Sequence, residues 1–229
     1  MKLDLHNHTW YSPDSITSPK QFIHYSKRKG VVLGVTEHGN ANSWKALEKE
    51  SKYFKWPFVR GQEQRVYWDK DFAGELIGLF LEVPLRSNQV GEVIDEIRSQ
   101  DGVVMIPHPF DNRHPGHSPH FRNLSHMMHQ VDLVEVFNAH TRHAHRTELA
   151  QQLAIRHHKP FSVGTDAHLP WEISHCHLEV DAQTLEEARE KILKNQSVPS
   201  IRKVHALNLW ASRFLRLSPL RRIVVPKHK

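Results

Sequence analysis

The six residues Asp4 to Thr9, DLHNHT, place ionisable side chains at every second position near the start of the chain. In an extended strand alternate side chains project from one face, so Asp4, His6 and His8 would converge on one small volume. Imidazole and carboxylate groups together suit transition metals. A polar face on an exposed edge strand would give the same spacing, so other parts of the chain must decide between the two interpretations.

Further candidate residues stand where apolar segments end. Six of them end or follow a predicted strand: His38, Glu63, His108, Asn138, Asp166 and His168. Strand-like and helix-like segments alternate, which predicts a parallel sheet with helical crossovers. In a parallel barrel the carboxyl ends of all strands share one face, where such folds place their chemistry. We therefore interpret DLHNHT as the first part of a convergent metal site.

Cap and periodicity signals predict the elements that position these residues. Ser18 caps a helix that has Pro19 at its first position and Gly30 just past its end, and Thr184 with Glu187 forms a capping box. The predicted helices are 19–29, 42–54, 88–99, 121–129, 144–157 and 185–194, and the predicted strands after the first are 31–38, 58–63, 75–81, 103–108, 133–138 and 161–166. About seven strands favour a closed or distorted barrel over an open doubly wound sheet.

The composition is that of one domain with a sizeable core, since the 229 residues are 38% hydrophobic. The single Cys176 allows neither an internal disulfide nor a cysteine zinc knuckle, so a metal site must use His and carboxylates. No apolar run reaches the length of a membrane span, and the N-terminus has no signal-peptide hydrophobic region. We expect a soluble, cytoplasmic protein without a membrane span.

The net charge of +6 is concentrated at the C-terminus. From Arg202 onward the chain has eight Lys or Arg and no acidic residue, which leaves 23 basic and 25 acidic residues in 1–201. We therefore separate a domain of residues 1–201 from a basic helix and tail of residues 202–229. Apolar residues at helical spacing predict a docked helix: Val204, Leu207, Trp210, Ala211 and Phe214. The alternative role of the tail is contact with RNA or an acidic surface.

An ordered set of motifs resembles one family over residues 1–180. The motifs are DLHNHTWYSPDS, GVTEHGN, GQE, GELIGLFLE, VVMIPHPFD, VEVFNAHTR and GTDAH. In this order they resemble the polymerase and histidinol phosphatase (PHP) family of metal-dependent phosphoesterases. The resemblance implies an α/β fold, a distorted (β/α)7 barrel that holds two to three divalent ions in a trinuclear type of centre. Zinc, manganese and iron all suit the mixed donors, and the sequence leaves the choice open.

The resemblance also implies a ligand set. It assigns His6, His8, Glu63 and Asp166 to one ion, lets Glu63 bridge to a second ion with His108, and assigns Asp14, His38 and His168 to a third. Many relatives carry His where this chain has Glu75. Strand alternation places Glu75 either toward the metals or in solvent, and an unpaired buried carboxylate would be costly. We predict that Glu75 is a ligand of the ion shared by Glu63 and His108.

Charge arithmetic favours a phosphate ester as substrate. Three divalent ions, four carboxylates and one hydroxide leave roughly one positive charge to attract a phosphate. We expect a metal-bridging hydroxide to attack phosphorus, in a site where Asp166 and His168 serve catalysis as well as metal binding. Asn138, His140 and Arg142 are predicted to bind substrate, and His140 or Arg142 to assist the leaving group. We expect the substrate to be a small phosphorylated metabolite, a nucleotide or a nucleic-acid end.

Two other functions are weighed against this hydrolase. An amidohydrolase also begins its barrel with His-x-His and ends it with Asp, but GVTEH and DAH add imidazoles that such enzymes do not usually need. The second alternative is a non-catalytic binding module on a degenerate barrel, against which the nearly complete ligand set argues. Cys176 stands between His175 and His177, but neighbours on a strand point apart, so we do not assign it a nucleophilic role.

Overall fold

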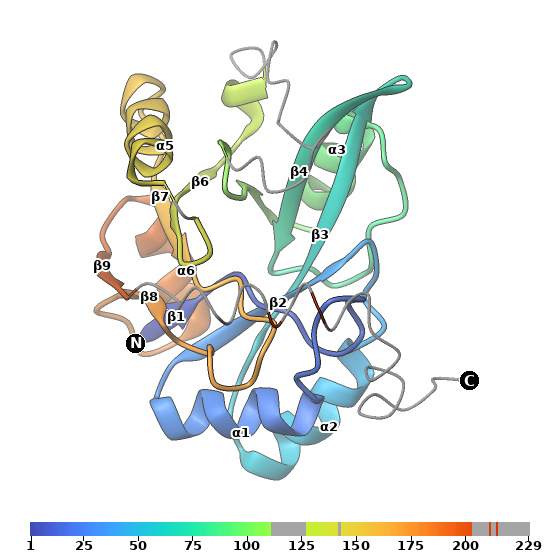
Figure 1. Ribbon diagram of the computed structural model, residues 1–229, viewed down its shortest axis with the longest axis vertical. Coiled ribbons are helices and arrows are strands. Elements are labelled where there is room, and N and C mark those ends of the chain that lie inside the picture. The colour runs from blue at the N-terminus through green and yellow to red at the C-terminus, as the bar shows by residue number, and fades with distance from the viewer. Residues whose placement is uncertain (111–126, 142, 203–210, 212–213, 215–229) are drawn as a thin grey trace.

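Figure 1 presents a computed structural model of the chain, which describes residues 1–110, 127–141, 143–202, 211 and 214. Within these ranges no helix combines the length and the apolar character needed to cross a membrane. Arg142, most of the predicted helix 121–129 and most of the predicted C-terminal helix and tail lie outside the described residues.

One mixed sheet runs through the molecule, with the strand order β7-β6-β5-β4-β3-β2-β1-β8-β9. Its strands are β1 (Lys2–Asp4), β2 (Val32–His38), β3 (Val59–Trp68), β4 (Asp71–Leu79), β5 (Val103–Ile106), β6 (Leu133–Asn138), β7 (Phe161–Gly164), β8 (Cys176–Glu179) and β9 (Val198–Ile201). The helices are α1 (Pro19–Lys29), α2 (Trp44–Phe54), α3 (Val90–Arg98), α5 (Ala144–Arg156) and α6 (Leu185–Leu193), with a short 3-10 helix η2 (Met128–Gln130). Helices α1 and α2 lie together at one end in Figure 1.

The sheet nearly closes into a barrel where the segments after β1 and β7 meet. Asn7 and Ala167 form a parallel bridge there. The Asp166 amide donates to the His6 carbonyl at 2.8 Å, and the His8 amide donates to the Ala167 carbonyl at 3.0 Å. The first and last predicted ligand segments are therefore joined by backbone hydrogen bonds.

The structure confirms the predicted barrel-like α/β fold. The predicted all-parallel sheet is wrong, because the observed sheet is mixed. The β3–β4, β4–β5, β1–β8 and β8–β9 pairs are antiparallel. Only Asp69 and Lys70 separate β3 from β4, and so short a connection permits an antiparallel hairpin but no parallel crossover. Glu63 consequently lies within a long strand rather than at its carboxyl end, and strands β8 and β9 were not predicted.

The local signals of α1 are confirmed. The Ser18 side chain accepts a hydrogen bond from the Gln21 amide, the Gln21 side chain accepts one from the Ser18 amide, and Gly30 ends the helix with a φ of 67°. Glycine adopts this left-handed backbone conformation at little energetic cost, because it has no Cβ. Helix α1 buries Phe22 and Ile23 in the apolar core of the barrel.

Candidate metal centre

The nine predicted metal ligands lie together at one end of the barrel. In the described part of the chain, four overlapping groups have ligand atoms within 4.8 Å of one another: His8, His38 and His168; His6, His8 and Glu63; His6, His108 and Asp166; and Glu63, Glu75 and His108. Asp14 joins them, since its Oδ1 lies 3.4 Å from Nε2 of both His38 and His168. The overlap means that several ions could share ligands.

The deep part of the centre consists of His6, His8, Glu63 and Asp166, whose side chains are at most 4% exposed. The Nε2 atoms of His6 and His8 lie 3.3 Å apart. Asp166 Oδ1 is 3.2 Å from His8 Nε2 and 3.5 Å from His6 Nε2. Both imidazoles thus direct the same ring nitrogen toward one carboxylate oxygen.

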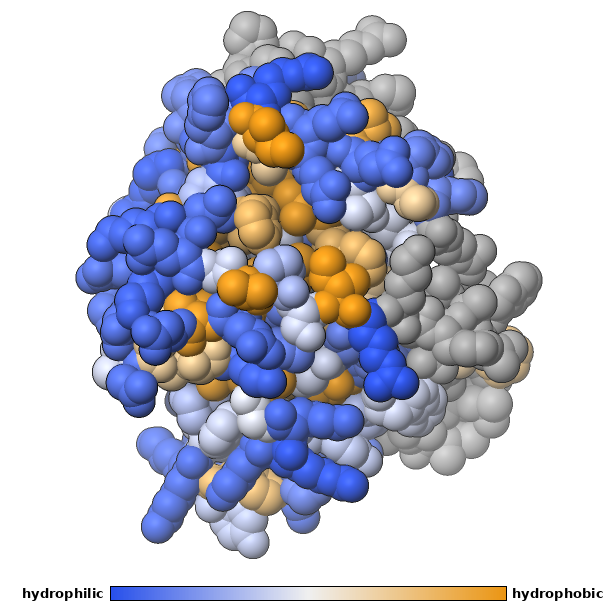
Figure 2. All heavy atoms as spheres, turned by 90° about the vertical axis from the view of Figure 1, so that its left-hand side faces the viewer, coloured by the Kyte–Doolittle hydropathy of each residue, from blue (hydrophilic) through white to orange (hydrophobic). Residues whose placement is uncertain are grey.

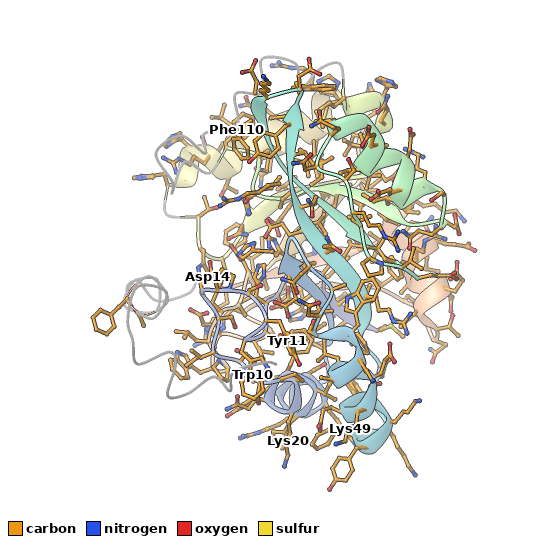
Figure 3. All side chains as sticks on the ribbon, turned by 90° about the vertical axis from the view of Figure 1, so that its right-hand side faces the viewer. Trp10, Tyr11, Asp14, Lys20, Lys49 and Phe110 are labelled. Carbon is orange, nitrogen blue, oxygen red and sulfur yellow. The ribbon has the colours of Figure 1, made fainter. Side chains whose placement is uncertain are left out.

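The rim of the centre is formed by Asp14, His38 and His168 on one side. Asp14 belongs to the loop between β1 and α1, which also carries Trp10 and Tyr11 (Figure 3). His38 ends β2, and its Nδ1 lies 2.7 Å from Glu63 Oε2. The His38 side chain is 31% exposed, so this side of the centre is open to a ligand from solvent.

Glu75 forms the rim on the other side. Strand β4 pairs antiparallel with β3, with Glu75 opposite Arg65 and Ile77 opposite Glu63, which places these side chains on one face. The Glu75 Oε2 atom lies 4.0 Å from His108 Nε2, and its Oε1 lies 3.4 Å from Arg65 Nε. Glu75 therefore lies next to the centre, where one carboxylate oxygen faces His108 and the other faces the exposed Arg65.

Two predicted ligands occupy unusual backbone positions. His108 has a φ of 27° and Asp166 a φ of 56°, both in the left-handed region that non-glycine residues seldom adopt. Such conformations persist only where the surrounding structure enforces them, and they cluster at functional sites. Each lies two residues past the end of its strand, and both contribute ligand atoms to the same group with His6.

Burial and neighbouring charges set the pKa values of the imidazoles. Burial, with His38 and His168 nearby, lowers the pKa of His8 to about 3, so this ring is neutral and able to bind a metal. Burial alone would lower the pKa of His38, but the carboxylates of Asp14 and Glu63 raise it well above its usual value. The carboxylates of Asp14 and Glu63 thus favour the protonated form of His38.

Buried polar groups hold the deep ligands in place. Glu37 accepts hydrogen bonds from the Thr9 amide and the Ser12 hydroxyl, and Ser12 Oγ lies 3.2 Å from His8 Nδ1. Glu37 is therefore linked to His8 through Ser12. Asp4 instead accepts from the Thr165 amide at 3.0 Å, and burial raises its pKa to about 7.

Two buried carboxylates near the centre were missed by sequence reasoning. Glu135 lies 3.0 Å from His6 Nδ1, and Glu172 accepts from the amides of His168 and Leu169. An available signal was the charge of Glu135 inside LVEVF, a strand segment whose other residues are apolar. For Glu172, which follows the last motif, no pattern in the sequence identified a partner.

The predicted substrate residues have different surroundings. Asn138 donates to Glu135 Oε2 at 3.1 Å and to Asp166 Oδ2 at 3.3 Å, which makes it a link between two carboxylates. His140 is buried, with Nε2 3.4 Å from Glu172 Oε1 and its ring 5.6 Å from that of His168.

Cys176 is buried, and burial raises the pKa of its thiol to about 12, which disfavours a thiolate nucleophile.

Comparisons with known proteins identify the family. Residues 144–197 match the PHP-associated family model. Over 170 residues the chain is 32% identical to the uncharacterized protein MJ1587 of Methanocaldococcus jannaschii, an alignment that covers 68% of this chain and 90% of that protein. Together with the fold, these matches show that the chain belongs to the PHP family.

Solved structures share the fold at low sequence identity. A two-domain protein from Bacteroides vulgatus, which contains a predicted PHP-like metal-dependent phosphoesterase, is 17% identical with a TM-score of 0.73 over 88% of this chain. This chain spans 65% of that protein. An amidohydrolase from Chromobacterium violaceum is 16% identical with a TM-score of 0.59, and the match covers 90% of this chain and 99% of that one.

Proposed function

We propose that this protein is a metal-dependent hydrolase of phosphate esters, with two to three divalent ions at the end of its barrel. The observation that carries the proposal is the set of four overlapping groups of ligand atoms within 4.8 Å. The predicted PHP-like metal-dependent phosphoesterase contained in the Bacteroides vulgatus protein of similar fold adds support. Residues 1–201 would form the catalytic domain, and residues 202–229 a basic tail.

The chemistry of the donor set fits zinc, manganese or iron. Neutral imidazoles suit these ions, and carboxylates such as Glu63 can bridge two of them. Without bound cations, three carboxylates of the centre, Asp14, Glu63 and Asp166, would be crowded together in a largely buried space. Bound divalent ions would neutralise these groups, activate water and stabilise charge on a phosphoryl group.

The protein's own residues would orient the reacting groups. Asn138 holds Asp166 by a hydrogen bond, and Glu172 fixes the turn that carries His168. We place His140 beside the leaving group, where its imidazole can donate a proton, and Arg142 against a phosphate oxygen. Asn138, His140 and Arg142 together would form the substrate-binding side of the site.

The test is a substrate panel with metal removal and reconstitution. Chelated protein should be inactive toward phosphomonoesters and phosphodiesters, and Mn²⁺, Zn²⁺ or Fe²⁺ should restore hydrolysis. The panel should include a nucleotide, a phosphorylated sugar and a short oligonucleotide with a terminal phosphate. Hydrolysis that persists unchanged in the chelated protein would refute the proposal.

Amide hydrolysis is the second candidate, because one protein of similar fold is an amidohydrolase. A cyclic amide in the same panel separates the two reactions. The second barrel-end imidazole pair, His38 with His168 around Asp14, favours the phosphate ester, since it offers a further cation site for phosphoryl oxygens. Metal-dependent amide cleavage without ester cleavage would reverse this order.

A further inference from the structure

Glu135 lies behind the deep ligands and forms hydrogen bonds to two other segments of the centre. It lies on β6, and its side chain is 0% exposed. Its Oε1 is 3.0 Å from His6 Nδ1, on the segment after β1. Its Oε2 accepts from the His108 amide at 2.8 Å and from Asn138 Nδ2 at 3.1 Å. One carboxylate thus connects the segments that carry His6, His108 and, through Asn138, Asp166.

The donors around Glu135 require a carboxylate. The backbone N–H of His108 and the Nδ2 group of Asn138 can only donate, so both demand an acceptor at Oε2. An acceptor at Oε1 places the ring proton of His6 on Nδ1. The lone pair of Nε2 is then directed into the centre, where His8 Nε2 is 3.3 Å away. A glutamine whose oxygen accepted from the two amides would direct its NH2 group at His6 Nδ1, which would move the ring proton to Nε2 and remove that lone pair from the centre.

Space for this contact comes from Gly164 at the end of β7. A Cβ on Gly164 would lie 2.1 Å from Glu135 Oε1 and 2.8 Å from the Cβ of His6. The first separation is far inside van der Waals contact, so any side chain there must displace the carboxylate from His6. The backbone of Gly164 has no positive φ, so the need for glycine is steric.

We propose that Glu135 is a positioning residue that fixes the His6 tautomer and sets the affinity of the deep ion site. This inference rests on the metal centre of the proposed function, but not on the identity of the ester. Hydrogen bonds of this kind hold a ligand ring in orientation and raise its basicity, and their loss typically lowers metal affinity 10–100-fold.

The experiment measures metal binding rather than turnover. Chelated protein is titrated with Co²⁺, and affinity and the visible spectrum of the bound ion are recorded. Glu135→Gln should weaken the tightest site about 10–100-fold and change its spectrum. The matched control is Glu190→Gln on α6, an exposed glutamate whose loss should leave both readouts unchanged. Unchanged affinity and spectrum in a folded Glu135→Gln protein would overturn the proposal.

A second variant separates position from charge. Gly164→Ala keeps the carboxylate but pushes it from His6, so it should weaken Co²⁺ binding in the same direction as Glu135→Gln. Wild-type binding by Gly164→Ala would show that only the charge matters and would overturn the positioning role. Should neither variant fold, nitrogen NMR of zinc-loaded wild-type protein decides, because the proposal requires a protonated Nδ1 and a metal-bound Nε2 on His6.

This test separates the two proposals. Wild-type protein that binds Co²⁺ but cleaves no phosphate ester would refute the proposed function and leave the role of Glu135 intact. Ester hydrolysis by the wild type, together with identical metal binding in wild type and in a folded Glu135→Gln protein, would support the proposed function and refute the role of Glu135. Wild-type protein that binds no divalent ion would refute both.

Discussion

The deep and rim parts of the candidate centre differ in how firmly the protein holds them. In the deep part, His6 is hydrogen-bonded to Glu135 and His8 to Ser12, and Asn138 holds Asp166. At the rim, Glu75 is 19% exposed on its side chain and contacts Arg65 at 3.4 Å, a pair that solvent screens. On the face shown in Figure 2, hydrophilic residues dominate the periphery and most of the apolar residues lie toward the middle.

The difference separates two tasks within one centre. A ligand whose ring orientation is fixed by a buried partner presents its lone pair at a defined position before any ion binds. A rim carboxylate on a partly exposed strand can adjust to ions of different size or charge. We therefore expect the deep residues to decide whether hydrolysis occurs and Glu75 at the rim to decide which metal is preferred.

The largest effect should follow loss of a deep ligand. His6→Ala should lower phosphate-ester hydrolysis by about 10³-fold or more, because an ion and its activated water are lost together. His24→Ala on the exposed face of α1 is the matched control and should be near neutral. Equal losses in the two variants, with both folded by circular dichroism, would remove the distinction between the site and the surface. His38→Ala and His168→Ala, measured in the same assay, should also lower phosphate-ester hydrolysis by orders of magnitude, because each removes a predicted ligand.

An intermediate effect is expected at Glu75. Glu75→Gln should lower metal content by up to one ion per chain and turnover by about tenfold. Glu75→His should keep the ion and shift its preference toward zinc, since oxygen donors favour harder ions than imidazole does. Elemental analysis of the three proteins after reconstitution in equal Mn²⁺ and Zn²⁺ measures both effects. The same content and selectivity in all three would place Glu75 outside the centre.

A smaller effect is expected at Arg65, which is 47% exposed on its side chain. Exposed ion pairs contribute about 0–1 kcal/mol, so Arg65→Gln should change metal affinity by less than about fivefold. The direction should be toward tighter binding, because a cation that competes for Glu75 is removed. A tenfold loss of affinity in the Co²⁺ titration would instead give Arg65 a direct role in the centre.

The smallest effect on activity is expected at Cys176, which belongs to neither part. Cys176→Ala should hydrolyse phosphate esters within about twofold of wild type, because burial keeps the thiol protonated. The raised pKa has a consequence for stability: between pH 9.0 and about 12 the native thiol holds a proton that the unfolded chain has lost. Stability therefore falls as pH rises through this window.

Urea unfolding of metal-free protein at pH 8 and pH 10 measures that dependence. The wild type should lose about 1 kcal/mol more than Cys176→Ala over this interval. An equal loss in both proteins would mean that Cys176 is accessible to solvent in the native state. If Cys176→Ala hydrolyses phosphate esters at one tenth of the wild-type rate or less, the prediction that the thiol takes no part in the reaction is wrong.

Local signals in the sequence determined single elements and the members of the centre. Ser18, Pro19 and Gly30 define the ends of α1 because caps depend on residues a few positions apart. The polar residues that follow apolar segments located His38, His108 and Asp166 at one end of the barrel. These inferences needed only the order of residues along the chain and the geometry of parallel strands.

Only the tertiary structure decided which segments pair and what stands behind the ligands. The antiparallel β3–β4 pairing puts Glu75 across from Arg65, and the added strands β8 and β9 extend the sheet beyond β1. Glu135 reaches His6 across 129 residues of sequence. Such contacts depend on strand direction, register and the space left by Gly164, which arise only when distant segments are packed together.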